Sequence, residues 1–166
     1  MDYTTSNIDL THYLMLKGIN LNQIVSKNKL LGKAKENGNY IINLEDSDKG
    51  MGSHWVALKC FKKTCLYFDS YGIAPPREVI SFCNKKKLIY SCDQIQGIKD
   101  TSCGFYCVYF LYHFNNLRSF KDDIRSLGYH LNLFLKPFDT SNTEKNVKIL
   151  KRRFKEIYEN DLKKYF

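Results

Sequence analysis

Four side chains in this sequence could together carry out acyl transfer. Cys103 stands where a polar stretch turns into an apolar one, and Gln96 lies seven residues upstream. His54 precedes one predicted strand, and Asp69 follows the next. A thiol nucleophile, an imidazole base, a carboxylate that orients the imidazole and an amide donor for the oxyanion are the parts of a cysteine acyl-transfer site. The sequence therefore predicts covalent catalysis at Cys103.

The spacing of two apolar runs predicts how His54 and Asp69 meet. Residues 55–60 and 64–68 are typical of two strands joined by a tight turn centred on Lys62. In such a hairpin His54 and Asp69 lie across from each other at the open end, with Cβ atoms about 4.5–5.5 Å apart. The carboxylate can then fix the imidazole tautomer and support its protonated form. A slip of one residue would turn the two side chains to opposite faces.

Cys103 stands at the start of a predicted helix, where backbone N–H groups favour a thiolate. They contribute only about 0.3–1 kcal/mol, so a protonated His54 must supply most of the stabilisation. Gln96 can aim its amide N–H at the oxyanion, beside the backbone N–H of Cys103. Gly97 and Gly104 leave room for a substrate backbone to approach.

Each of these residues also has an ordinary structural explanation. A histidine beside a tryptophan is usually packed in the core, and an aspartate at a strand end usually caps a turn. A cysteine in an apolar helix is usually a small buried side chain. The joint occurrence of four such groups at compatible positions favours the catalytic interpretation.

Hydrophobic spacing predicts the elements that must hold these groups. Strands are predicted at 40–44, 55–60, 64–68 and 88–91. Helices are predicted at 6–17, 77–86, 101–115 and 120–127, the last ended by Gly128. The stretch 21–31 is predicted as a weak helix or a loop. Strands in the middle with helices on both sides, without regular alternation, predict an α+β domain.

The length of 166 residues predicts a single domain over 1–166. The N-terminus lacks the pattern of a signal peptide. The longest apolar run, 103–114, is too short to span a membrane. We therefore expect a soluble, intracellular monomer that is not secreted and has no membrane partner.

The formal net charge is +9, which favours polyanions such as DNA. A solvated, lysine-rich surface explains the same charge. Residues 144–166 form a basic amphipathic pattern, which predicts a C-terminal surface helix docked by its apolar stripe. Contact of this helix with a polyanion or a membrane surface is the less favoured interpretation.

The cysteines other than Cys103 are expected to be reduced, and most of them small and buried, because an intracellular protein of this size needs no disulfide framework. This set comprises Cys60, Cys65, Cys83, Cys92 and Cys107. The sequence has no C-x-x-C pair, so we expect no metal site.

Four separated motifs resemble the adenovirus protease (adenain) family, within the wider group of ubiquitin-like-protein proteases. The chain order His54, Asp69, Gln96, Cys103 and the step from glutamine to cysteine both agree, and the resemblance covers about residues 39–116. The motifs are Tyr40-Ile41-Ile42-Asn43, Gly52-Ser53-His54-Trp55-Val56-Ala57, Tyr67-Phe68-Asp69-Ser70-Tyr71-Gly72, and Gln96-Gly97 with Ser102-Cys103-Gly104-Phe105-Tyr106-Cys107.

The resemblance implies a papain-like core with permuted order, whose central, mostly antiparallel sheet is flanked by helices. It implies a cysteine endopeptidase with Cys103 as nucleophile, His54 as base and acid, Asp69 as orienter and Gln96 as oxyanion donor. Trp55, Gly52, Gly97 and Gly104 would contact the substrate.

The same resemblance implies a biological setting. The substrates would be viral capsid or core precursors, cleaved in the virion and in the host cytoplasm or viral factory. No metal or organic cofactor is required. DNA would be the activating polyanion. An activating peptide stays open, because Cys83 and Cys92 do not match the family's peptide-bonding position. The lysine-, asparagine- and tyrosine-rich composition favours a virophage or Maverick-type source.

Two other functions remain open. The first is deconjugation of a ubiquitin-like modifier by the same chemistry; no obvious insertion for binding a large modifier is present, which favours the maturation protease. The second is a non-enzymatic, basic DNA-binding or packaging protein, in which replacing Cys103 would leave function intact.

Overall fold

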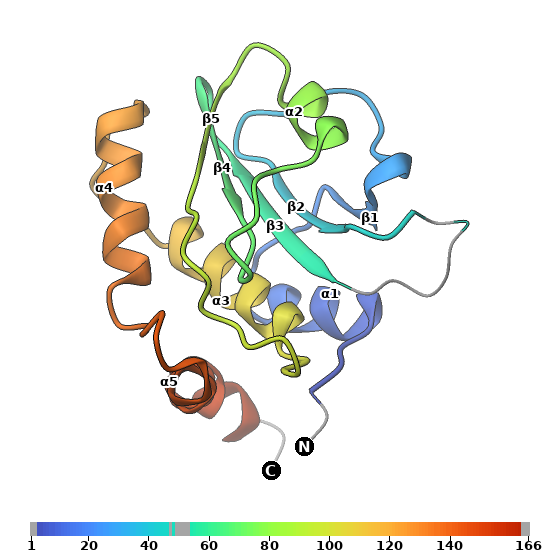
Figure 1. Cartoon of the computed structure of the whole chain (residues 1–166). Helices are drawn as coiled ribbons and strands as arrows, with labels where there is room; N and C mark the ends of the chain where they lie inside the picture. The colour runs from blue at the N-terminus through green and yellow to red at the C-terminus, as the bar shows by residue number, and fades with distance from the viewer. Residues whose placement is uncertain (1–2, 47, 49–53, 164–166) are drawn as a thin grey trace.

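A five-stranded sheet in the order β1-β2-β3-β4-β5 runs through the molecule (Figure 1). It is seen in a computed structural model that describes residues 3–46, 48 and 54–163. The strands are β1 (Gln23–Ser26), β2 (Asn39–Asn43), β3 (Trp55–Cys60), β4 (Thr64–Phe68) and β5 (Lys87–Tyr90). The helices are α1 (Asn7–Leu16), a 3-10 turn η1 (Lys27–Lys29), α2 (Arg77–Cys83), α3 (Cys103–Asn115), α4 (Ile124–Leu135) and α5 (Thr143–Lys163).

The sheet is mixed. Its two central pairs, β2–β3 and β3–β4, are antiparallel, whereas β1 and β5 join the edges in parallel. The predicted α+β class is confirmed, and the expected antiparallel pairing holds for the centre of the sheet. Each outer strand is parallel to its neighbour because a long connection, residues 27–38 or 69–86, carries the chain back along the sheet before the next strand begins.

Side-chain alternation gives each face of the central strands its own apolar core. Helix α3 packs on one face together with α1, α4 and α5, and Figure 1 shows it lying between the sheet and α5. Helix α2 covers the other face. The first core takes Ile41, Ala57, Leu66 and Phe68 from the sheet, and the second takes Tyr40, Ile42, Val56, Leu58, Cys60, Cys65 and Tyr67. Helix α3, which begins at Cys103, therefore packs directly on β3 and β4, the strands next to His54 and Asp69.

Two sequence predictions are wrong. The stretch 21–31 contains β1 and η1 rather than a helix or plain loop, because parallel pairing of residues 23–26 with β2 supplies backbone hydrogen bonds. The helix predicted to end at Gly128 instead continues through it to Leu135. A buried stripe of Leu127, Leu131 and Phe134 outweighs the modest cost of one glycine in a helix interior.

Helix α5 docks through aromatic side chains. Phe154 contacts Tyr13 and Phe105, with ring centroids 5.5 and 4.9 Å apart, and the Tyr158 hydroxyl donates to the Tyr13 carbonyl at 2.7 Å. The helix thereby covers α1 and α3. Within the described part of the chain, no helix is both long and apolar enough to cross a membrane.

Candidate active site

The β3–β4 hairpin brings His54 and Asp69 together, although in a different register from the predicted one. Cys60 pairs with Cys65 and Ala57 with Phe68, so the turn is not centred on Lys62. Extending this register places His54 and Asp69 as diagonal neighbours on one face. Their contact survives the shift, and His54 Nε2 lies 2.7 Å from Asp69 Oδ1.

Asp69 is held by the turn that follows β4. Its Oδ1 accepts a second hydrogen bond from the Tyr71 backbone N–H at 2.8 Å, and its carbonyl accepts from Gly72 N at 2.8 Å. The Tyr71 ring stacks on the imidazole of His54, with centroids 4.3 Å apart and planes inclined by 24°. Asp69 is 3% exposed and His54 7%. The carboxylate and the aromatic ring together fix the plane of the imidazole.

The surroundings of His54 favour its protonated form. Burial lowers the pKa of His54, but its interactions with the Asp69 carboxylate and with Cys103 outweigh burial and raise the pKa to about 9. Nδ1 forms no hydrogen bond of standard geometry with any residue that the structure describes. That nitrogen remains available for proton exchange with the thiol.

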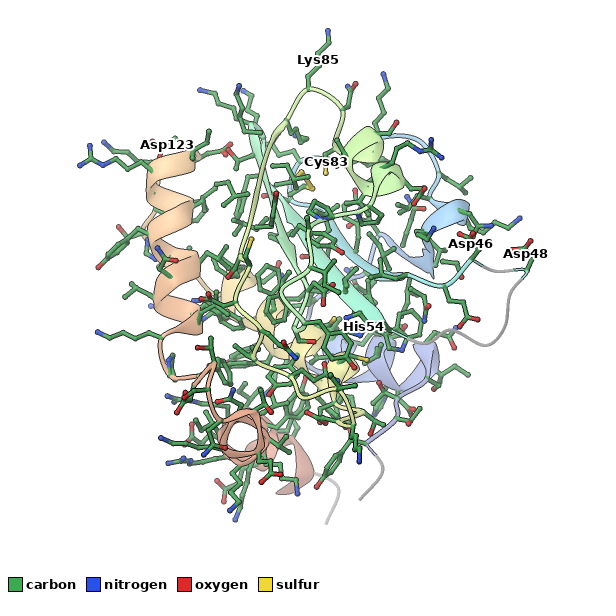
Figure 2. All side chains as sticks on the ribbon, viewed as in Figure 1. Asp46, Asp48, His54, Cys83, Lys85 and Asp123 are labelled. Atoms are coloured by element: carbon green, nitrogen blue, oxygen red, sulfur yellow. A yellow bond between two sulfur atoms is a disulfide. The ribbon has the colours of Figure 1, made fainter. Side chains whose placement is uncertain are left out.

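Cys103 is the first residue of α3. Its Sγ accepts a hydrogen bond from the backbone N–H of Trp55 at 3.5 Å, which ties the helix to the start of β3. The Ser102 hydroxyl donates to the Asp100 carboxylate and does not cap the helix. Because the Ser102 side chain does not accept from them, the backbone N–H groups of the first turn of α3 are left for other acceptors near Cys103. Figure 2 shows His54 close to this end of β3.

Gln96 is fully buried, with both ends of its amide engaged. Its Oε1 accepts from the Ser70 hydroxyl at 2.5 Å, and its Nε2 donates to the Asp100 carbonyl at 2.6 Å. An amide NH₂ group has two hydrogens, so a second N–H is left for another acceptor. Gln96 and Cys103 line the same groove.

That groove has a volume of about 930 Å³. Its lining comes from the segment before and within α1, from β1 and from the loop before α3. The lining residues beyond those of the site are Thr4, Thr5, Ser6, Asn7, Asp9, Ile24, Val25, Ser26, Ile98, Lys99, Asp100 and Thr101. A groove with walls from three separate segments suits an extended peptide.

The predicted substrate-binding residues have different fates. Trp55 lines the groove, and its indole N–H donates to the Thr5 carbonyl at 3.2 Å. The space that a Cβ on Gly104 would fill is taken by Thr5 Oγ1, 1.9 Å from the Cβ position. At Gly97 the neighbour is Thr143 Oγ1, at 2.9 Å. Both glycines therefore make room for the chain's own side chains. Gly52 lies outside the described residues.

The prediction that all cysteines are reduced is wrong at two positions. Cys60 and Cys65 form a disulfide, because the register places them directly opposite each other with Cα atoms 4.1 Å apart. Cys92 is exposed, whereas Cys83 and Cys107 are buried as expected.

The sulfurs of Cys60, Cys65 and Cys83 lie within 4.8 Å of one another, and among the described residues they alone have the spacing of metal ligands. With the disulfide formed, Cys83 is the remaining thiol of that group. Cys83 is the last residue of α2, and Figure 2 shows it well away from His54.

Sequence reasoning missed three contributors to the site. Tyr71 stacks on the imidazole, Ser70 binds the Gln96 amide, and Thr5 supports Trp55. Ser70 and Tyr71 directly follow Asp69, so their position in the motif was the available signal. Nothing in the local sequence around Thr5 indicates its contact with residues about 50 and 100 positions away.

No protein-family model and no curated protein matches this chain. Among solved structures, the chain is similar to a crystal structure of the ASFV pS273R protease. The identity is 22% and the TM-score 0.39, and the match covers 48% of this chain and 36% of that one. At this level the likeness carries no argument about chemistry, and the functional case depends on the geometry described above.

Proposed function

We propose that this protein is a cysteine endopeptidase. The observation that carries the proposal is the buried His54–Asp69 pair, 2.7 Å apart, whose imidazole interacts with Cys103, the first residue of α3 and part of the groove lining. A purely structural histidine needs no interaction with a cysteine, and a filler cysteine needs no position at a groove.

The first half of the reaction forms a thioester. His54 Nδ1 takes the proton of the Cys103 thiol, and the thiolate attacks the carbonyl carbon of the scissile peptide bond. Asp69 holds the imidazole by Nε2 and stabilises the imidazolium. The oxyanion receives hydrogen bonds from the Cys103 backbone N–H and the second N–H of Gln96 Nε2. The imidazolium then gives its proton to the leaving amine.

The second half releases the enzyme. A water molecule loses a proton to His54 and attacks the thioester carbon, with the oxyanion held by the same two donors. Collapse of the intermediate frees the carboxylate product, and the proton on His54 returns to the Cys103 sulfur. No step needs a metal or an organic cofactor.

The substrates we propose are viral capsid or core precursor proteins, processed during maturation in the virion or viral factory. This part rests on the motif resemblance. DNA as an activating polyanion rests on the net charge of +9 and on the basic side chains of α5. The logarithm of the affinity for DNA should fall linearly with the logarithm of the salt concentration. An affinity that does not change with salt would exclude this part of the proposal.

Mass spectrometry of cleavage products tests the function. Wild type and Cys103→Ala are incubated with the protein products of neighbouring genes, and new N-termini are identified. The matched control is Cys107→Ala, one helical turn further on, where burial raises the pKa of the thiol well above its usual value. We expect cleavage by wild type and the control only. Equal products from Cys103→Ala would exclude the proposal.

Alkylation tests the thiol independently of any substrate. At mildly acidic pH, iodoacetamide should label Cys103 faster than the exposed Cys92, because the imidazolium of His54 favours the thiolate. His54→Ala should remove this difference. Slower labelling of Cys103 than of Cys92 in wild type would contradict the activation.

A further inference from the structure

The amide of Gln96 has only one orientation that satisfies its neighbours. The Asp100 carbonyl can only accept, so the amide nitrogen must face it, at 2.6 Å. The amide oxygen then faces the Ser70 hydroxyl, which donates to it at 2.5 Å. Gln96 is 0% exposed and Ser70 1%, so water does not compete for either group.

Ser70 also binds the backbone on which Gln96 is carried. The Ser70 carbonyl accepts from the N–H groups of Ile95 and Gln96, at 2.9 and 3.0 Å. One residue therefore fixes the position of Gln96 through its main chain and the direction of its amide through its side chain. Because Asp69 orients His54, a single turn after β4 sets both the base and the oxyanion donor.

A hydroxyl on the amide oxygen has two consequences for the nitrogen. The Ser70 hydroxyl opposes a flip of the Gln96 amide. A flipped amide would place its oxygen against the Asp100 carbonyl and the developing oxyanion. The hydroxyl also polarises the amide, which strengthens the N–H groups as donors. Without it, a buried amide oxygen loses its partner and the side chain gains alternative rotamers.

We propose that Ser70 is the positioning residue for the oxyanion donor Gln96, acting through its hydroxyl on Oε1. The proposal rests on the proposed protease function. It assigns to Ser70 an effect on the transition state and none on the thiol or on binding of the ground-state substrate.

Kinetics of Ser70→Ala test this assignment. We expect kcat to fall about five- to tenfold, the size of a lost neutral hydrogen bond, with KM unchanged. In the Gln96→Ala background, which by itself costs about 10²–10³-fold, the same change should lower kcat by less than about twofold. An increase in KM with kcat unchanged would overturn the proposal. So would a double variant in which the losses in kcat of the two single variants multiply.

Two further measurements separate positioning from general damage. The rate of Cys103 alkylation in Ser70→Ala should equal that of wild type, and slower alkylation would mean that Ser70 acts through Asp69 and His54 instead. In NMR spectra of the labelled protein, exchange of the Gln96 side-chain amide hydrogens should accelerate in Ser70→Ala. Unchanged exchange in Ser70→Ala would overturn the proposal about Ser70, whether or not the wild-type protein cleaves a substrate. Absence of cleavage by wild type would instead overturn the proposed protease function.

Discussion

Strand β3 buries a basic side chain near each of its ends, and the two behave oppositely. His54, just before the strand, meets a carboxylate, and its pKa is raised to about 9. Lys59, near the other end, is 4% exposed and donates to neutral oxygens, Asn115 Oδ1 at 2.9 Å and the Asn37 carbonyl at 3.4 Å. Burial lowers its pKa to about 8.

The comparison shows that the partner, not burial, decides whether a buried base keeps its proton. Desolvation penalises the charged form at both positions. Only at His54 does a negative charge within hydrogen-bonding distance reverse the outcome. A base that can hold and release a proton is therefore found at one end of the strand, and a structural amine at the other.

The strongest way to break the comparison is to remove each base in turn. His54→Ala should lower kcat/KM by at least about 10³-fold, because both proton transfers and the activation of Cys103 are lost. Lys59→Met keeps the length of the side chain and should change kcat/KM by less than about threefold. Steady-state kinetics on one peptide substrate measure both. A comparable loss in the two variants would mean that fold stability, not proton transfer, explains the effect.

Changing the partner tests the cause of the raised pKa. Asp69→Asn should lower kcat by about 10²–10⁴-fold. The wild-type profile of kcat/KM against pH should fall on the alkaline side near pH 9, where the imidazolium is lost. Without the carboxylate, burial dominates and this limb should move to lower pH. If the alkaline limb of the Asp69→Asn profile stays near pH 9, it reports the titration of a group other than His54.

Tyr71 sharpens the comparison, since its ring stacks on the imidazole of His54, whereas the Lys59 amine lies 5.7 Å from the centroid of the Phe61 ring. Tyr71→Leu removes the ring 4.3 Å from the imidazole and should lower kcat by about two- to tenfold, in line with about 0.5–1.5 kcal/mol for an aromatic pair. The control is Tyr129→Leu, an exposed tyrosine on α4, which should leave kcat unchanged. Equal losses in the two variants would contradict a role for stacking.

The smallest expected effect is on stability against pH. Lys59 has a pKa of about 8 when folded and 10.5 as its ordinary value, so the unfolded chain binds more protons between them. Its contribution therefore becomes more favourable as pH rises from 8 to 10.5. His54 acts in the opposite direction: its contribution is complete below 6.5 and is lost as pH rises through about 9.

Urea unfolding of wild type and Lys59→Met between pH 8 and 10 isolates the contribution of Lys59 to the free energy of unfolding. The difference in the free energy of unfolding, wild type minus variant, should rise by about 2 kcal/mol from pH 8 to 10. A difference that is constant with pH would show that Lys59 stays protonated in the folded protein.

The sequence predicted the hairpin strands 55–60 and 64–68 at their observed bounds. Their apolar runs are short and separated by two lysines, so local pattern and tertiary structure agree there. It did not predict β1, because a four-residue edge strand depends on backbone pairing with a distant segment and not on its own pattern. Nor did it predict the disulfide, because the expectation of reduced cysteines rested on the compartment and the size of the chain, whereas Cys60 and Cys65 meet through the register of the hairpin.

The candidate site divides in the same way. His54, Asp69 and Cys103 could be selected because reactive side-chain types in a fixed order have few explanations. Ser70 and Thr5 could not, because a serine or threonine occurs at many positions and only the folded chain shows what its oxygen contacts. The sequence also could not show that Thr5 occupies the space left by the missing side chain of Gly104.

The packing of Thr5 on Gly104 has a practical consequence. The stretch from Thr4 to Asp9 borders the groove and contributes none of the reacting groups. A bulkier or smaller side chain at an exposed position of this stretch, such as Asn7, would narrow or widen the groove while Thr5 and the thiol, imidazole and carboxylate stay in place. Selectivity for the residues flanking a cleaved bond could thus be engineered from the start of the chain, independently of turnover.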